Sequence, residues 1–149
     1  MEKSKFVYLN RKDYFTIEFG EFDKNYVKDK SSKFVQLYIN KESFIVVGNG
    51  LYHKDILKLY LERFNLKFDT RLNKLKDEVP LEKGKNYEMA GAGRVKFVDG
   101  KLIFYDNSSD YIAMFPKGTN KKHLEDFFRI DKIREEDGAH GTISLFVDF

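Results

Sequence analysis

The first part of the chain alternates short apolar and aromatic runs with polar residues, a pattern that predicts β-strands. The predicted strands are KFVYL (5–9), YFTIEF (14–19), KFVQLYI (33–39) and SFIVVG (43–48). Only the polar residues NKE (40–42) separate the last two runs, and such a short polar connection is typical of a hairpin. The chain therefore begins with β-structure.

After the predicted turn GNG (48–50), the apolar positions take the spacing of a helix in YHKDILKLYLERF (52–64). The residues at every fourth position are Tyr52, Ile56, Tyr60 and Phe64. This spacing predicts an amphipathic helix with one broad apolar face. His53 falls in its first turn.

Residues 65–86 carry the weakest pattern of the chain. Thr70 is a candidate cap for a short helix that runs through Leu75, and Pro80 would stop such a helix. We interpret the whole segment as a surface insertion.

A second hairpin and a second helix are predicted in the C-terminal half. Residues 87–106 form two strand patterns around Asp99-Gly100, a strong two-residue turn signature, and NSSD (107–110) then interrupts regular structure. From Thr119, the run 121–137 has helical spacing, and Gly138 suits its C-terminal cap. The apolar side of this predicted helix contains Leu124, Phe127, Phe128 and Ile133. GTISLFVDF (141–149) predicts a final strand.

This order of elements predicts an α/β fold, with a mixed sheet of about six or more strands and one main helix on each side. With 149 residues, 42% apolar and 16% aromatic, the chain can bury a core, and we expect a single domain over 1–149. The absence of cysteine excludes disulfides, thiolate nucleophiles, zinc ribbons and iron–sulfur ligation. No run resembles a signal peptide or a membrane span, so we expect a soluble, cytoplasmic protein.

The net charge of +3 is modest, and acidic and basic residues are interspersed. A dedicated duplex-binding protein would more often carry a basic stripe, so we do not expect nucleic acid as the main partner. Most of the aromatic residues that could stack on single-stranded nucleic acid occupy positions with core periodicity.

Four short stretches are candidates for chemistry. The first, GAGR (91–94), precedes a predicted hairpin, whereas Rossmann and Walker glycines open a helix, so those nucleotide folds fit poorly. The glycines still permit close backbone approach to a ligand. The guanidinium of Arg94 could bind an oxyanion in a bidentate manner. The alternative is a β-bulge with a surface arginine.

The other stretches are NSSD, Lys33 and His53. NSSD offers hydroxyls and backbone N–H groups that could form an anion-binding nest, or it is an ordinary polar turn. Lys33 at a strand start is by itself uninformative. His53 lies where the helix dipole disfavours imidazolium, and a neutral imidazole can accept a proton or attack phosphorus.

The two remaining histidines suggest no site. His123 and His140 are expected at the surface, on the second helix and in a glycine-flanked turn. No histidine and carboxylate spacing indicates a metal site, so we expect neither a metal nor another cofactor.

Taken in order, KFVQLYI, YHKDILKLYLE, MAGAGRVKF and LIFYDNSSDY resemble the Janus/ocnus-type protein phosphohistidine phosphatase family. The similarity runs from about residue 33 to the C-terminus. It implies a six-stranded mixed sheet with two helices, metal-independent catalysis and His53 as the catalytic residue. It also implies that the phosphate is held by Lys33, Arg94, and a cradle at Ser108, Ser109 and Asp110.

The chain departs from the family pattern in several places. Ala92 replaces a glycine, YDNS replaces Y-G-Y-S, and Asp110 adds a negative charge beside the expected anion loop. Residues 65–86 are longer than the family connection. In residues 1–30 we expect an extension with additional strands, which the resemblance does not explain.

Two hypotheses follow. The first is a metal-independent phosphatase-like hydrolase acting on a phosphoramidate (phosphohistidine or phospholysine) or a phosphate ester, with His53 as general base or nucleophile. The second is a binding protein that sequesters a nucleotide or another phosphorylated ligand without hydrolysis. The negative charge of Asp110 and the altered loop motivate this second hypothesis. The expected partner is a phosphorylated protein or a small phosphorylated ligand.

Overall fold

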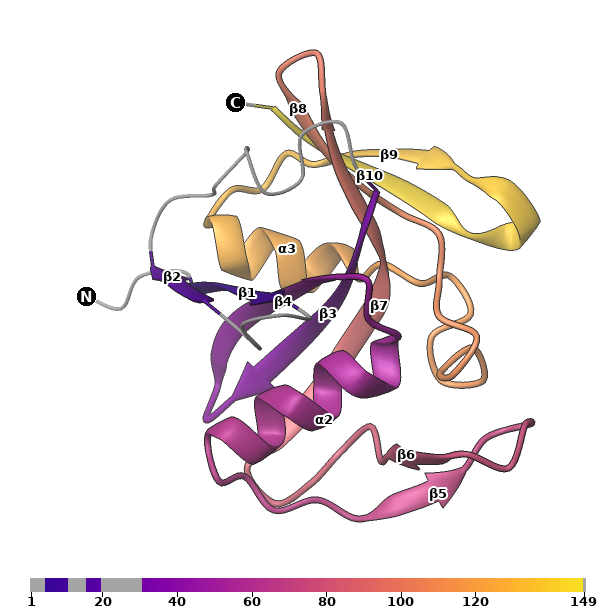
Figure 1. The fold of residues 1–149 in the computed structure, drawn as a ribbon. Helices are drawn as coiled ribbons and strands as arrows, with labels where there is room; N and C mark the ends of the chain where they lie inside the picture. The colour runs from indigo at the N-terminus through magenta and orange to yellow at the C-terminus, as the bar shows by residue number, and fades with distance from the viewer. Residues whose placement is uncertain (1–4, 11–15, 20–30, 149) are drawn as a thin grey trace.

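The computed structural model describes residues 5–10, 16–19 and 31–148, with side chains described for 6–9 and 31–148. Within these residues, an eight-stranded sheet has the order β2-β1-β4-β3-β7-β8-β10-β9 (Figure 1). Its strands are β1 (Lys5–Asn10), β2 (Thr16–Phe19), β3 (Ser32–Ile39), β4 (Glu42–Asn49), β7 (Tyr87–Val98), β8 (Lys101–Tyr105), β9 (Arg134–Asp137) and β10 (Ile143–Asp148). Strands β1 and β4 pair in parallel and the other neighbours are antiparallel, so the sheet is mixed as predicted.

Both predicted hairpins are confirmed, and the backbone angles of their turns explain why they form. The β3–β4 turn has φ of 52° at Asn40 and 71° at Lys41. The β7–β8 turn has φ of 51° at Asp99 and 74° at Gly100. Positive φ at both central residues matches the twist of the flanking strands, and Asn, Asp and Gly tolerate it best.

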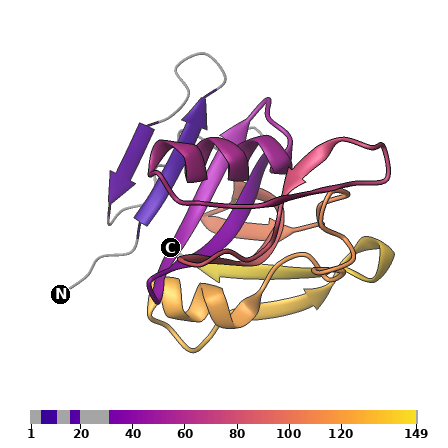
Figure 2. The same cartoon turned by 90° about the horizontal axis from the view of Figure 1, so that it is seen from below.

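Two helices lie on opposite faces of the sheet, as Figures 1 and 2 show. Helix α2 (His53–Arg63) covers one face and α3 (Lys121–Phe128) covers the other. Successive strand residues alternate between the two cores because side chains along a strand point to opposite faces. In β3, for example, Phe34 packs in the core with α3 and Val35 in the core with α2. The predicted α/β class is confirmed.

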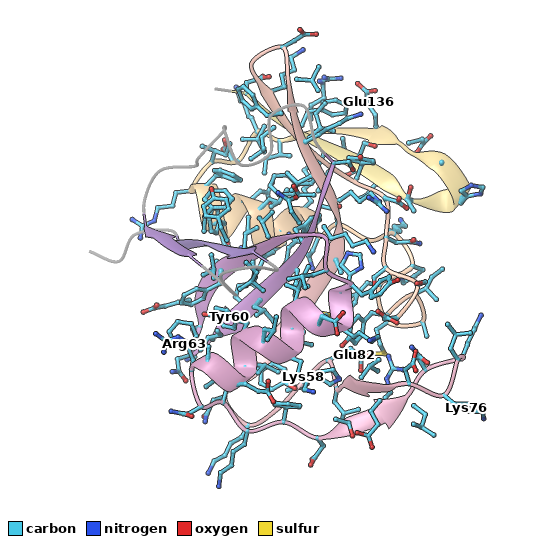
Figure 3. All side chains as sticks on the ribbon, viewed as in Figure 1. Lys58, Tyr60, Arg63, Lys76, Glu82 and Glu136 are labelled. Carbon is cyan, nitrogen blue, oxygen red and sulfur yellow. The ribbon has the colours of Figure 1, made fainter. Side chains whose placement is uncertain are left out.

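Helix α2 is amphipathic, and Ile56 and Tyr60 of its predicted apolar face are buried. Tyr52 and Phe64, predicted on the same face, flank the helix and are exposed. Tyr60 is buried toward the sheet, and Lys58 is exposed on the opposite side (Figure 3). The helix is positioned by its apolar face, so its first residue, His53, is held at a defined place above the sheet. In the described residues, neither helix has the length and apolarity required to cross a bilayer.

The N-terminal strands belong to the same sheet. In β1, Phe6 and Tyr8 contribute to the core with α3, and Val7 and Leu9 contribute to the core with α2. The predicted strands of the extension are therefore confirmed at β1 and β2. The rest of the predicted 1–30 extension lies outside the described residues.

The short helix predicted at residues 70–75 is wrong. This segment contains β5 (Thr70–Leu72), which pairs with β6 (Glu78–Pro80) in a separate two-stranded sheet. The side chain of Asn73 closes the turn between them by accepting hydrogen bonds from the N–H groups of Leu75 and Asp77, both at 2.9 Å. This local capping competes with helix formation.

The second predicted helix is too long. It ends at Phe128, because Arg129 adopts a left-handed conformation (φ 58°), and residues 134–137 form the edge strand β9 instead. Gly138 therefore precedes the short 3-10 turn η1 (Ala139–Gly141) and does not cap α3. Pairing with the open edge of β10 overrides the helical spacing. Asn120 caps the start of α3, and its side chain accepts from the N–H of His123 at 3.0 Å.

Candidate functional site

His53 is the first residue of α2 and is buried, with 4% of its surface exposed. Its Nε2 lies 2.8 Å from the carbonyl oxygen of Gly93 in β7. Because a carbonyl only accepts, Nε2 carries the proton, and Nδ1 of the neutral ring is left with its lone pair. No described residue forms a hydrogen bond with Nδ1. The bond to Gly93 therefore fixes both the tautomer and the orientation of the ring.

The surroundings of His53 keep it neutral. Burial is the largest cause that lowers the pKa of His53, and the positive charges of Lys33 and Arg94 act in the same direction. Against the opposing effects of the Gly93 carbonyl and Asp110, the resulting pKa is about 4. Near neutral pH the imidazole is therefore a base, with the lone pair on Nδ1. The structure thus agrees with the neutral histidine expected at this helix start.

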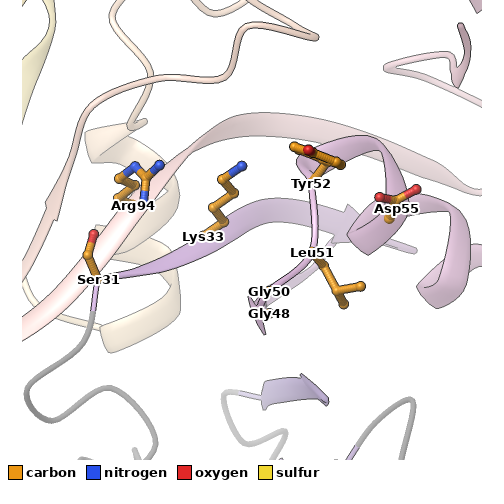
Figure 4. Close-up of a pocket in the computed structure, with 8 residues that line it drawn as sticks. All are labelled: Ser31, Lys33, Gly48, Gly50, Leu51, Tyr52, Asp55 and Arg94. Atoms are coloured by element: carbon orange, nitrogen blue, oxygen red, sulfur yellow. The ribbon is translucent and has the colours of Figure 1, made fainter. Parts of the chain in front are cut away.

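Lys33 and Arg94 are cross-strand partners in the antiparallel β3–β7 pair. Their cationic ends lie side by side at a pocket of about 440 Å³ (Figure 4). The pocket is lined by Ser31, Lys33, Gly48, Gly50, Leu51, Tyr52, Asp55 and Arg94. Burial and the charge of Arg94 lower the pKa of Lys33, while nearby carboxylates oppose this shift. An anion bound between the two cations would relieve their repulsion.

Asp106 supplies part of the counter-charge at this pair. Its carboxylate lies 3.5 Å from Nε of Arg94, and both side chains are partly exposed. Such an exposed pair is weak, so the guanidinium is available to a stronger anionic ligand.

The GAGR segment lies inside β7, which continues into the β7–β8 hairpin, so it does not open a helix. A Cβ at Gly91 would stand 2.7 Å from the Gly118 carbonyl oxygen, and one at Gly93 would stand 2.4 Å from that of Tyr105. The close approach at these glycines is therefore made by the chain's own backbone. The pairing of β3 with β7 shifts register between Gln36 and Leu37, which confirms an irregularity of the β-bulge kind in this strand.

The NSSD loop has an unusual hydroxyl. Ser108 is 2% exposed, and its Oγ is one of two buried side-chain polar atoms without a hydrogen-bond partner in the described residues. A buried hydroxyl of this kind costs free energy unless a water or ligand satisfies it. Ser109, in contrast, is exposed. The N–H of Tyr111 donates a hydrogen bond to the carbonyl of Ser108 at 3.2 Å, within the loop itself.

Asp110 is turned to the start of α2. One carboxylate oxygen lies 3.4 Å from the backbone nitrogen of Lys54, and the other accepts from Nδ2 of Asn73 at 3.1 Å. Tyr52, the N-terminal cap residue, makes no side-chain capping bond. Asp110 therefore places a negative charge at the helix end where a phosphoryl group was expected.

The segment 65–86 also supports this loop. Arg71 donates to the backbone oxygen of Asp110 at 3.0 Å and to the carboxylate of Glu82 at 2.5 Å. Arg71 and Asn73 were not predicted as neighbours of the site, because nothing in their local sequence pattern connects them with residue 110. Tyr52 and Asp55 were not predicted as site residues either, although they lie beside His53 in YHKD.

The predicted surface position of His123 is wrong. It is fully buried, and its Nε2 donates to the carbonyl of Leu37 at 2.9 Å while Nδ1 lies 3.2 Å from Nε2 of Gln36. Burial lowers the pKa of His123 to about 4. His123 joins α3 to β3 and is separate from the pocket. His140 is exposed, as predicted.

Comparisons with models of protein families, with curated proteins and with solved structures found no match to this chain. Within the described residues, no three His, Cys, Asp or Glu side chains gather in a way that could hold a metal ion. Lys33 and Arg94 line the pocket. The neutral His53 and several carboxylates lie close to these two cations, although His53 is not among the lining residues. This arrangement can hold an oxyanion and accept a proton beside it.

Proposed function

We propose that the chain is a metal-independent phosphatase-like hydrolase that acts on a phosphoramidate, such as phosphohistidine or phospholysine, or on a phosphate ester. The observation that carries this proposal is the position of Lys33 and Arg94 on paired strands beside a histidine whose pKa is lowered. The proposal includes a phosphohistidine phosphatase-like fold, which the resemblance implies and with which the mixed sheet and its two helices agree.

In this proposal, Lys33 and Arg94 neutralise the phosphoryl oxygens, and the hydroxyl of Ser108 adds a hydrogen bond. His53 acts through Nδ1, because Nε2 is held by Gly93. Nδ1 either takes a proton from the water that attacks phosphorus or attacks phosphorus itself, with later hydrolysis of the phosphorylated ring. In both routes the P–N or P–O bond breaks, and the leaving group takes up a proton.

Asp110 favours a second candidate, a binding protein that holds a phosphorylated ligand without hydrolysing it. Its carboxylate lies against the N-terminus of α2, where it repels a phosphoryl dianion and occupies the backbone donor of Lys54. In this case the ligand would be recovered chemically intact.

The test is a titration with inorganic phosphate followed by NMR, and then a turnover assay on phosphohistidine and phospholysine. The proposal expects phosphate-dependent shifts near residues 33, 53 and 94, and hydrolysis that the His53→Gln variant loses by about 10²–10⁴-fold. Gln keeps an N–H group that can donate to Gly93 but has no basic nitrogen. The matched control is His140→Gln, at an exposed histidine outside the pocket. Binding without turnover would select the second candidate, and equal turnover by His53→Gln would exclude the mechanism.

A further inference from the structure

The pocket beside His53 is larger than a phosphoryl group requires. Its volume of about 440 Å³ falls within the range of roughly 300–1,000 Å³ found for small-molecule sites. Lys33 and Arg94 contribute its cationic part, and Tyr52 and Asp55 of the segment that starts α2 contribute another part (Figure 4). The residues around the second part indicate which group accompanies the phosphate.

Tyr52 is an exposed aromatic wall of this pocket. Its side chain is 63% exposed although it is large and apolar. The Nζ atom of Lys33 lies 4.7 Å from the centroid of the ring, and that of Lys54 lies 5.5 Å from it. Proteins that bind nucleotides or single strands combine such an aromatic face, on which a base stacks, with a neighbouring cation for the phosphate.

Asp55 adds an acceptor to the same part of the pocket. Its Oδ1 lies 3.4 Å from Nζ of Lys54, and no described residue forms a hydrogen bond with Oδ2. A carboxylate repels phosphate but accepts hydrogen bonds from the hydroxyls of a ribose, as in dinucleotide sites. Asp55 would therefore orient a ligand with its phosphate toward Lys33 and Arg94 and its sugar toward the helix.

We infer that the pocket takes a nucleoside monophosphate group, with its phosphate on Lys33 and Arg94, its base against Tyr52 and a ribose hydroxyl on Asp55. This inference rests on the proposed phosphoryl site and names the chemical class of its ligand. It holds for either candidate function, because a nucleoside phosphate can be bound with or without hydrolysis.

The experiment compares the affinities of adenosine 5′-monophosphate, ribose 5-phosphate, 2′,3′-dideoxyadenosine 5′-monophosphate and inorganic phosphate by calorimetry. We expect adenosine monophosphate to bind about tenfold or more tightly than ribose 5-phosphate, the usual size of one base-stacking contact. The Tyr52→Leu variant should remove most of this ratio, and Tyr52→Phe should keep it. The Asp55→Ala variant should remove the preference of the protein for the ribose over the dideoxyribose ligand.

The other possible results distinguish failure of the nucleoside inference from failure of the phosphoryl site. If phosphate and ribose 5-phosphate bind and adenosine monophosphate binds no better, the phosphoryl site stands and the nucleoside inference fails. A ratio that survives in Tyr52→Leu also overturns the inference, because the base then lies elsewhere. If none of the phosphates binds, the proposed function fails together with the inference.

Discussion

The carboxylate of Asp110 lies 3.4 Å from the backbone nitrogen of Lys54 and so places a negative charge at the N-terminus of α2. The two residues are 56 positions apart in the chain. Asp110 thus supplies the helix with the capping charge that Tyr52 does not provide. It also puts a carboxylate next to the site at which Lys33 and Arg94 would hold an anion.

We expect Asp110→Asn to bind inorganic phosphate several-fold more tightly than the wild type, because the variant removes a like charge without changing the size of the side chain. The same change should lower the free energy of unfolding by about 0.3–1 kcal/mol, since the helix loses a favourable charge at its N-terminus. Calorimetric titration and urea unfolding measure the two effects. Asp137→Asn, on the exposed edge strand β9, is the control and should change neither. A weaker affinity in Asp110→Asn would show that this carboxylate assists binding.

The paired cations give a second prediction. Lys33→Met and Arg94→Met should each weaken phosphate binding by about tenfold or more, because each removes a charge-assisted contact. Lys58→Met, which removes an exposed lysine from the outer face of α2, should leave the affinity nearly unchanged (Figure 3). Equal losses in all three variants would indicate a general charge effect and not a site.

Arg94→Lys separates the role of geometry from that of charge. A lysine keeps the positive charge but lacks the planar guanidinium that can make two parallel hydrogen bonds to a phosphate. We therefore expect an affinity between those of the wild type and Arg94→Met. An affinity equal to the wild type would show that Arg94 acts only through its charge.

The two buried histidines predict a fall of stability in mild acid. The folded-state pKa values of His53 and His123 are about 4, below the ordinary value of 6.5 in the unfolded chain. Between pH 6.5 and 4 the unfolded chain therefore binds protons that the folded chain does not. The free energy of unfolding should fall as the pH is lowered, by at most about 1.4 kcal/mol per pH unit for each histidine. Above pH 6.5 both rings are neutral in both states, and this contribution is constant.

Urea unfolding at a series of pH values between 7.5 and 5 measures this dependence. His123→Gln should reduce the slope by about half of the histidine contribution, although the variant is less stable at every pH. An unchanged slope in His123→Gln would mean that His123 is charged in the folded protein.

Gly93 should tolerate no side chain. A Cβ there would stand 2.4 Å from the carbonyl oxygen of Tyr105 and 2.9 Å from that of Asp106, and neither backbone atom can move cheaply. We expect Gly93→Ala to lower the free energy of unfolding by more than about 2 kcal/mol, as measured by urea unfolding. Gly100→Asn is the control, because nothing lies within 4 Å of its Cβ position and Asn accepts its positive φ. A small effect at Gly93 would mean that the β8 end is not packed as described.

The local sequence pattern was sufficient to predict the turns and helices that form through interactions between near neighbours. The turn at Asp99-Gly100, the hairpin at 40–42 and the helix that starts at His53 were all predicted, because turn chemistry and helical spacing act between near neighbours. The low pKa of His53 was also expected in direction from the dipole of the helix, although burial is its largest cause.

Only the tertiary structure decided the remaining features. Residues 134–137 have helical spacing, but an open edge of β10 recruits them as β9, and burial places His123 in the core through contacts with Gln36 and Leu37. The register of β3 against β7 sets Lys33 opposite Arg94, and the loop after β8 carries Asp110 to Lys54. These relationships join residues distant in the sequence, so they depend on strand pairing and packing that no local pattern encodes. The sequence alone determined the types of residue available to the site, and the paired strands determined which of them meet.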